Sequence, residues 1–94
     1  MIIEMRNYQL KPGSVPTFEE RFAKALPVRE KFSKLAAFWH TEVGQLNQVI
    51  HVWPYASFEE RTKVRAEASK APGWPPDTRE FVVSQPSVAL LPAP

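Results

Sequence analysis

The sequence contains no cysteine, and glycine and histidine are scarce. Without cysteine the protein has no disulfides, thiolate nucleophiles, iron–sulfur clusters or cysteine-based zinc sites. The three glycines stand far apart, so neither a glycine-rich phosphate loop nor a dinucleotide-binding fingerprint is present. A Ser-His-Asp order typical of serine hydrolases is also missing. These absences exclude several familiar kinds of catalytic and phosphate-binding site.

Strong charge imbalance and long apolar runs are missing as well. The 94 residues include 12 Lys and Arg against 10 Asp and Glu, with the two signs interspersed. We therefore predict no nucleic-acid partner, because a phosphate backbone needs a basic face. The longest apolar run, residues 35–39, is too short to cross a bilayer, and Glu4 and Arg6 interrupt the region where a signal peptide is apolar. We expect one domain over residues 1–94, located in the cytoplasm and without a membrane partner.

The first part of the chain is predicted to form a strand and a helix. Residues 2–10 alternate in the manner of a strand, and residues 11–14 (KPGS) have the composition of a turn. Apolar residues at helical spacing predict a helix over about 15–32, with a capping box at residues 17–20. Pro27 is expected to kink or end this helix.

A hairpin is predicted in the middle of the chain. Two strand-like runs, residues 35–43 and 46–54, flank Gly44 and Gln45. Glycine at the first central position suits a two-residue type II′ turn.

The last part of the chain is predicted to add a helix and a strand. A second capping box opens a helix over residues 57–70. The last strand lies within residues 79–91, is expected to break near Pro86, and runs into a proline-rich tail over about 86–94. The order β-α-β-β-α-β predicts an α+β, ferredoxin-like fold, in which a four-stranded antiparallel sheet carries both helices on one face.

The hairpin register sorts the strand residues into two faces. Val43 opposes Leu46, and opposed residues lie on the same face. A four-residue loop gives the same two faces, whereas a three-residue loop would exchange them. The first face collects Ala37, Trp39, Thr41, Val43, Leu46, Gln48, Ile50 and Val52. The second face collects Phe38, His40, Glu42, Asn47, Val49, His51 and Trp53.

We expect the first, more apolar face to pack under the helices. Ile3 and Met5 of the first strand belong with it, which places Glu4, Arg6 and Tyr8 with the second face. The second face is too apolar for water and too polar for a sealed core. We therefore predict a homodimer in which two copies of this face meet around a partly polar cavity.

The second face carries the candidate functional residues. His51 is the best candidate for a catalytic group, because an imidazole pKa of ~6.5 suits a general base at neutral pH. Arg6 would hold an anionic oxygen, and Tyr8 and Asn47 would donate hydrogen bonds. Trp53 would stack on a flat substrate, although core or interface packing is its commoner role. The predicted ligand-binding set is Arg6, Tyr8, His40, Glu42, Asn47, His51 and Trp53.

Two of these groups have other interpretations. Arg6 is equally expected to form an ion pair with Glu4 or Glu42. His40, Glu42 and His51 form an H-x-E…H pattern that resembles a two-histidine, one-carboxylate metal site. The pattern is short and lacks a further donor at a suitable spacing. We therefore predict that the protein binds no metal and no cofactor.

Several motifs resemble the NIPSNAP family. The strongest is residues 46–55 (LNQVIHVWPY), followed by residues 57–61 (SFEER). Residues 4–13 and 39–44 are also similar to that family, and the similarity weakens after Asp77. The resemblance implies a dimeric α/β barrel, in which two ferredoxin-like subunits pack sheet to sheet. Structurally similar families include small cofactor-independent monooxygenases with a ligand pocket in each subunit.

The family resemblance assigns no reaction to small stand-alone members. Together with the candidate residues, it predicts a small-molecule pocket protein or a metal-independent, monooxygenase- or isomerase-like enzyme. The expected ligand is a flat, partly anionic organic molecule. The alternative is a non-catalytic dimeric scaffold or interaction module. A cavity distinguishes the two, since an interior filled by Trp53, Phe38 and Tyr8 would leave no room for a substrate.

Overall fold

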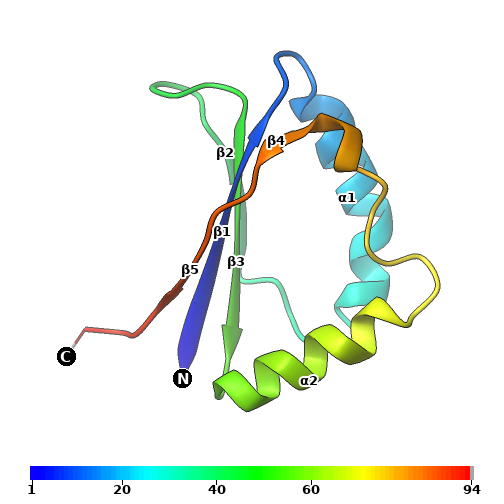
Figure 1. Cartoon of the computed structure of the whole chain (residues 1–94), viewed down its shortest axis with the longest axis vertical. Coiled ribbons are helices and arrows are strands. Elements are labelled where there is room, and N and C mark those ends of the chain that lie inside the picture. The colour runs from blue at the N-terminus through cyan, green and yellow to red at the C-terminus, as the bar shows by residue number, and fades with distance from the viewer. Residues whose placement is uncertain (94) are drawn as a thin grey trace.

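The computed structural model describes residues 1–93 as a five-stranded antiparallel sheet with two helices on one side (Figure 1). The strands are β1 (Ile2–Leu10), β2 (Ala37–His40), β3 (Gln48–Tyr55), β4 (Val82–Ser84) and β5 (Ser87–Leu90), and the helices are α1 (Val15–Arg29), α2 (Phe58–Ser69) and the short 3-10 helix η1 (Arg79–Phe81). The strand order is β2-β3-β1-β4, and β5 also pairs with β1. The predicted ferredoxin-like α+β fold is confirmed. The last strand is divided at Pro86, so that β5 lies within the segment predicted as a tail.

The two helices begin differently. In α2 the first half of the predicted capping box forms, because the Ser57 hydroxyl accepts a hydrogen bond from the Glu60 backbone N–H at 3.1 Å. The Glu60 carboxylate accepts from the Ala56 N–H and not from the Ser57 N–H. In α1 the helix starts before the predicted box at residues 17–20, and the Ser14 hydroxyl donates to the Lys11 carbonyl instead. Pro27 lies inside α1, which ends two residues later. Neither helix described within residues 1–93 is long and apolar enough to cross a membrane.

The hairpin has the predicted register but a different loop. Phe38 opposes His51, as expected. The connection is not a two-residue turn, because residues 41–47 lie outside the strands. At the start of this loop the Thr41 N–H donates to the Gln48 carbonyl, and the Thr41 hydroxyl donates to the Gln48 side chain. Asn47 adopts a φ of 60° and accepts a hydrogen bond from the Gly13 N–H, which ties this loop to the turn after β1. Since side chains alternate along a strand, the longer loop leaves the two faces unchanged.

The helices cover the second face, so the predicted orientation of the sheet is wrong. We call this covered side the inner face; it carries Ile2, Glu4, Arg6, Tyr8, Phe38, Val49, His51, Trp53 and Tyr55. Phe22 of α1 lies 4.6 Å from Phe38 and 5.2 Å from His51 between ring centroids. The sequence-based prediction chose the face under the helices from the polarity of each side chain taken alone. The inner face can be buried because its polar groups bond to one another, as the Trp53 indole does to His51.

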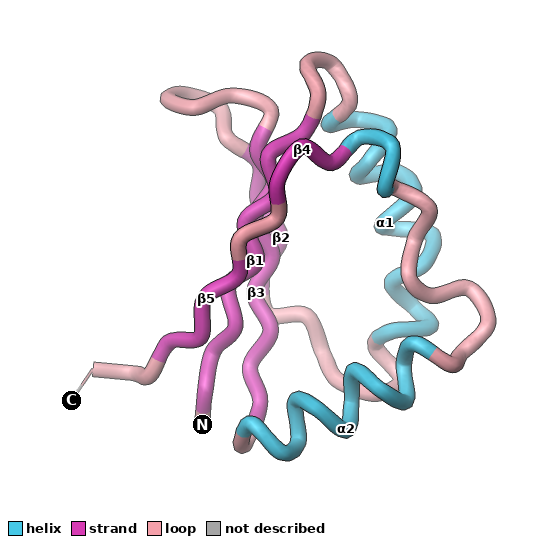
Figure 2. The backbone as a smooth tube through the Cα atoms, in the orientation of Figure 1, coloured by secondary structure: helices cyan, strands magenta, loops and turns pink. Residues whose placement is uncertain are grey.

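The outer face of the sheet is apolar and carries no helix within residues 1–93 (Figure 2). It carries Ile3, Met5, Trp39, Ile50, Val52, Val88 and Leu90, together with the polar Asn7, Gln9 and Gln48. The side chain of Trp39 is 57% exposed there. The loop between β2 and β3 and the chain end after β5 extend on the same side (Figure 2). The predicted dimer contact through Phe38, Val49, His51 and Trp53 is therefore excluded, because α1 already packs on that surface.

The orientation of the sheet predicts unequal losses of stability for two valines of β3. Val49→Ala should lower the free energy of unfolding by about 2 kcal/mol, because this side chain is fully buried under the helices. Val52→Ala, the matched control on the outer face, should cost clearly less. Urea unfolding measures both changes, and a larger cost for Val52→Ala would contradict the observed orientation.

Candidate functional site

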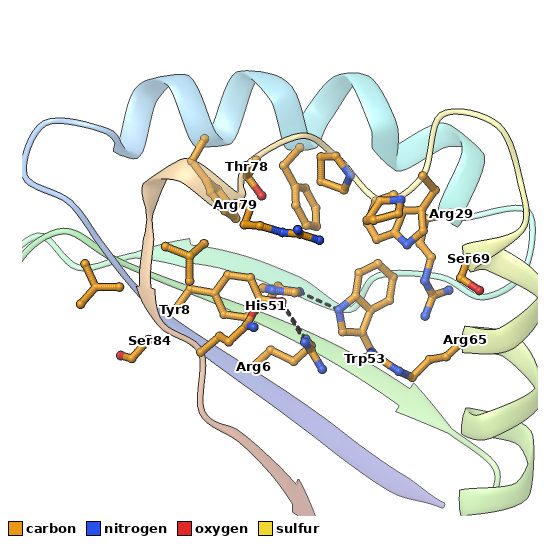
Figure 3. Close-up of a pocket in the computed structure, with 18 residues that line it drawn as sticks. Arg6, Tyr8, Arg29, His51, Trp53, Arg65, Ser69, Thr78, Arg79 and Ser84 are labelled. Carbon is orange, nitrogen blue, oxygen red and sulfur yellow. Dashed lines mark hydrogen bonds between the residues drawn. The ribbon is translucent and has the colours of Figure 1, made fainter.

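A cavity of about 470 Å³ lies between the inner face and the helices (Figure 3). The sheet forms its floor, α1 and α2 form two walls, and residues 74–79 with β4 close it. Aromatic rings line much of it, from Tyr8, Phe18, Phe22, His51, Trp53 and Trp74. The aromatic side chains thus line the cavity without filling it, and the space between the sheet and the helices is not closed by Trp53, Phe38 and Tyr8.

Four guanidinium groups line the cavity, those of Arg6, Arg29, Arg65 and Arg79. Figure 3 shows that they come from β1, α1, α2 and η1, which surround the cavity from different sides. No Asp or Glu is among the lining residues in the described part of the chain. The cavity is therefore strongly positive and complementary to an anion.

Glu4 lies behind the cavity and organises three arginines. Its Oε2 accepts a hydrogen bond from Arg61 Nε at 3.0 Å and lies 3.4 Å from Arg6 Nη1, and Arg65 Nη1 lies 3.8 Å from Oε1. Burial alone would raise the pKa of Glu4, but the bond from Arg61 and the charges of the three guanidiniums together lower it. One carboxylate among three guanidiniums leaves an excess of positive charge. Arg6 and Arg65 carry this excess to the cavity wall.

Arg29 adds a fixed positive charge. Only 3% of this residue is exposed. Its guanidinium donates to the Tyr55 hydroxyl and the Ser33 hydroxyl, each at 2.7 Å, and lies 4.3 Å from the centre of the Trp53 ring. Within residues 1–93 no carboxylate forms an ion pair with it. The hydroxyls and the indole face hold the group in place without neutralising its charge.

His51 is a neutral hydrogen-bond donor. The indole N–H of Trp53 donates to His51 Nδ1 at 2.7 Å, and because an indole nitrogen can only donate, the imidazole proton belongs on Nε2. Burial, and then the charge of Arg6, lower the pKa of His51 to about 3. Nε2 is buried and has no hydrogen-bond partner within residues 1–93. At neutral pH this arrangement suits a donor better than the general base that the sequence predicts.

Tyr8 lies beside His51 and receives two hydrogen bonds from Arg6. The Tyr8 hydroxyl oxygen accepts from Arg6 Nε at 3.1 Å and from Arg6 Nη2 at 2.9 Å. The rings of Tyr8 and His51 pack edge to face with centroids 4.9 Å apart. Since both bonds use the oxygen as acceptor, the hydroxyl hydrogen of Tyr8 is left to donate elsewhere.

Of the seven predicted residues, Arg6, Tyr8, His51 and Trp53 line the cavity, and His40, Glu42 and Asn47 do not. β2 ends at His40, so Glu42 and Asn47 lie in the loop beyond the cavity. His40 Nδ1 lies 2.7 Å from Glu19 Oε2, and this hydrogen bond and charge raise the pKa of His40. The considered metal triad is therefore not assembled. No cluster of three potential metal-ligating side chains occurs among the residues that the structure describes.

The sequence analysis missed Arg29, Arg65, Trp74 and Arg79. Arg29 follows the buried Phe18 and Phe22 at helical spacing, so the periodicity of α1 contained a signal for it. Arg65 lies one turn after Arg61 on a helix whose many charges gave no such signal. Trp74 and Arg79 lie in a loop and in η1, where no periodicity fixes the direction of a side chain.

Comparison with known proteins identifies relatives along the whole chain. Residues 3–94 match the family model described as NIPSNAP. Human NipSnap homolog 3A is 36% identical over 89 residues, which cover 94% of this chain and 34% of that protein. A NipSnap homolog from Dictyostelium discoideum is 39% identical over 71 residues, which cover 76% of this chain and 32% of that protein. The chain thus spans about a third of the length of these curated relatives.

A solved structure agrees with the fold. An uncharacterized NIPSNAP domain protein from Burkholderia xenovorans is 30% identical, with a TM-score of 0.89 over 99% of this chain and 95% of that chain. The resemblance predicted from residues 46–61 is thereby confirmed.

The buried, neutral state of His51 predicts a pH-dependent stability. Because the unfolded chain takes up the proton at ~pH 6.5 whereas the folded chain does so only at about 3, the free energy of unfolding should fall as the pH drops through this window. The slope from this group reaches about 1.4 kcal/mol per pH unit. His51→Gln keeps an acceptor for the Trp53 indole and should flatten the curve between about pH 6 and pH 5, in the upper part of this window.

Urea unfolding at several pH values measures the difference between the two proteins. His40 titrates in both and cancels in the comparison. Parallel curves for the two proteins would contradict the assignment of a neutral His51.

Proposed function

The chain belongs to the NIPSNAP family, and from its cavity we propose that it binds a flat organic anion between the sheet and the helices. The observation that carries the proposal is the lining itself. Four guanidinium groups and several aromatic rings face one partly open cavity, and no carboxylate is among the lining residues described within 1–93. A cation that is not paired with a carboxylate inside a cavity is stabilised when an anionic ligand enters.

The shape of the cavity favours a flat ligand. Its volume of about 470 Å³ lies within the range of small-molecule sites. The ring of Trp74 stands edge to face against Phe22 and Trp53, with centroids 5.8 Å and 6.5 Å apart. These aromatic edges and faces form apolar walls that suit a fused or substituted aromatic ring system.

The accessible arginines favour an acidic group on that ligand. Arg79 and Arg65 are exposed in part and reach the cavity from η1 and α2, where a ligand would meet them on entering from solvent. Burial and the nearby charge of Arg6 lower the pKa of Arg65, which means that its positive charge is disfavoured where it stands. A carboxylate close to both guanidiniums would relieve this repulsion and accept hydrogen bonds from a planar donor fork.

The partner we propose is a second copy of the chain on the outer face. The outer face is largely apolar, and Val43 in the loop after β2 and Leu91 after β5 are 88% and 75% exposed. The loop after β2 and the chain end after β5 both extend on the outer side of the sheet (Figure 2). A second copy would cover these apolar groups, as obligate dimers do. Since the cavity lies on the helix side of the sheet, such a homodimer would not cover either cavity. The homodimer is equally compatible with the alternative function as a scaffold. The cytoplasmic location stays a prediction.

The anion proposal predicts a difference between two ligands of the same ring. 2-Naphthoate should raise the melting temperature, because it binds the folded chain alone, and the neutral 2-naphthylmethanol should raise it much less. Arg79→Gln should weaken 2-naphthoate binding by about tenfold, the equivalent of one charge-assisted hydrogen bond. Lys24→Gln removes the same charge from an exposed position of α1 away from the cavity and should leave binding unchanged. Calorimetric titration measures the affinities, and equal binding of the two ligands would contradict the proposal.

The dimer proposal predicts the effect of a charge on the outer face. Trp39→Glu should convert the dimer into a monomer, because a carboxylate would be buried between two apolar sheets. Phe58→Glu changes an equally exposed aromatic side chain on α2 and should leave the dimer intact. Sedimentation velocity distinguishes the two, and a wild-type monomer at micromolar concentration would contradict the proposed interface.

A further inference from the structure

We propose that the cavity takes hydroxylated aromatic compounds as oxyanions, with Tyr8 and His51 donating to the ionised oxygen and the proton released to solvent. This inference rests on the proposed function, because it concerns the same cavity. It adds a second polar group to the ligand, a weakly acidic hydroxyl. It also gives this hydroxyl a defined place, on the floor of the cavity above β1 and β3.

The first argument is the absence of a base. The titratable side chains lining the cavity within residues 1–93 are four arginines, Tyr8 and His51. The lone pair of His51 Nδ1 is occupied by the Trp53 indole N–H. No lining side chain is thus available to take up a proton at neutral pH. When the O–H bond of a bound phenol or enol breaks, its proton must go to water, and both electrons of the bond stay on the ligand oxygen.

The second argument is a pair of unused donors. His51 Nε2–H is buried without a partner, and 96% of the residue is withdrawn from solvent, since only 4% is exposed. The Tyr8 hydroxyl hydrogen is free because Arg6 uses the oxygen as acceptor. A buried donor without an acceptor destabilises the folded chain, and an entering oxygen removes that cost. In the ligand-free chain Nε2 is covered, so binding includes a small shift of the side chains around it.

The third argument is the polarity of these two donors. Arg6 places a guanidinium against the Tyr8 oxygen, which makes the Tyr8 hydroxyl hydrogen a stronger donor. The positive charges of Arg6 and Arg65 also favour a negatively charged ligand oxygen over a neutral one beside Tyr8 and His51. These groups therefore stabilise an oxyanion more than they stabilise the corresponding neutral hydroxyl. The pKa of the bound hydroxyl must consequently fall.

The closing edge of the cavity supplies a further cation. Arg79 comes from η1 and lies across the cavity from Tyr8 and His51 (Figure 3). A flat ligand with an oxyanion on the floor would thus have a guanidinium on its other side. Because Arg79 is exposed, it can move to admit the ligand and then return. The cavity is suited to an aromatic ring that carries an ionisable hydroxyl as well as an acidic group.

The test uses 4-nitrophenol, which turns yellow only when it ionises near neutral pH. Added protein should develop the yellow colour at a pH where the free compound is colourless. The apparent pKa of the bound phenol should fall by about one unit or more, the equivalent of a tenfold preference for the ionised form. Protons should appear in a weakly buffered solution in proportion to the bound ligand. 4-Nitroanisole has the same ring without an ionisable proton and should bind at least about tenfold more weakly.

Two variants test the donors. Tyr8→Phe and His51→Met, whose thioether sulfur accepts weakly but cannot donate, should each reduce the shift in the apparent pKa of 4-nitrophenol, and by more than they weaken binding of 4-nitrobenzoate. Lys24→Gln changes a surface charge on α1 and should leave the shift unchanged. A full shift in both donor variants would overturn the assignment of Tyr8 and His51.

4-Nitrobenzoate separates this inference from the proposed function. If 4-nitrobenzoate binds while 4-nitrophenol keeps its free pKa, the oxyanion inference is wrong and the anion-binding function stands. If neither compound binds, both are wrong.

Discussion

The hydrogen bond from the Trp53 indole to His51 is the interaction on which the rest of the structure depends. It lets two large polar aromatic groups be buried side by side on β3, where α1 packs on them. It also fixes the imidazole as an Nε2–H donor. The same bond thus stabilises the interior and sets the chemistry of the cavity, because a buried network is stable only when its members have partners. Nε2 is the member whose partner the chain itself does not supply within residues 1–93.

The distribution of charge follows from this buried network. Glu4 is the acidic group that supports the arginines of β1 and α2, and it lies behind them and away from the cavity. Guanidiniums on the cavity side therefore keep part of their charge uncompensated, which costs stability in the ligand-free chain. In a protein that binds no anion, a second carboxylate beside these arginines would increase the stability of the folded chain. The positive cavity and the apolar outer face lie on opposite sides of one sheet, so the proposed ligand binding and the proposed self-association would not compete for the same surface.

The sequence predicted the elements, their order and the hairpin register, because these depend on local periodicity and capping. Phe38 opposes His51 in spite of the wrong turn, because Thr41 still bonds to Gln48, the pairing that the predicted register requires. The choice of the buried face failed because it depends on pairs such as Trp53 with His51 and Arg29 with Tyr55, which single-residue polarity does not reveal. Four of the seven candidate residues line the cavity, although on the helix side of the sheet. The arginines of α1, α2 and η1 could not be placed without the tertiary packing.

The three tryptophans allow a direct measurement of the central claim, that a flat anion binds between the sheet and the helices. Trp53 and Trp74 line the cavity, whereas Trp39 lies on the outer face. The indole N–H resonances in a nitrogen–proton correlation spectrum can be followed while 2-naphthoate is added. The account predicts that the resonances of Trp53 and Trp74 shift and saturate together while that of Trp39 stays in place. A saturating shift of Trp39 alone, or no shift of any of the three, would contradict it.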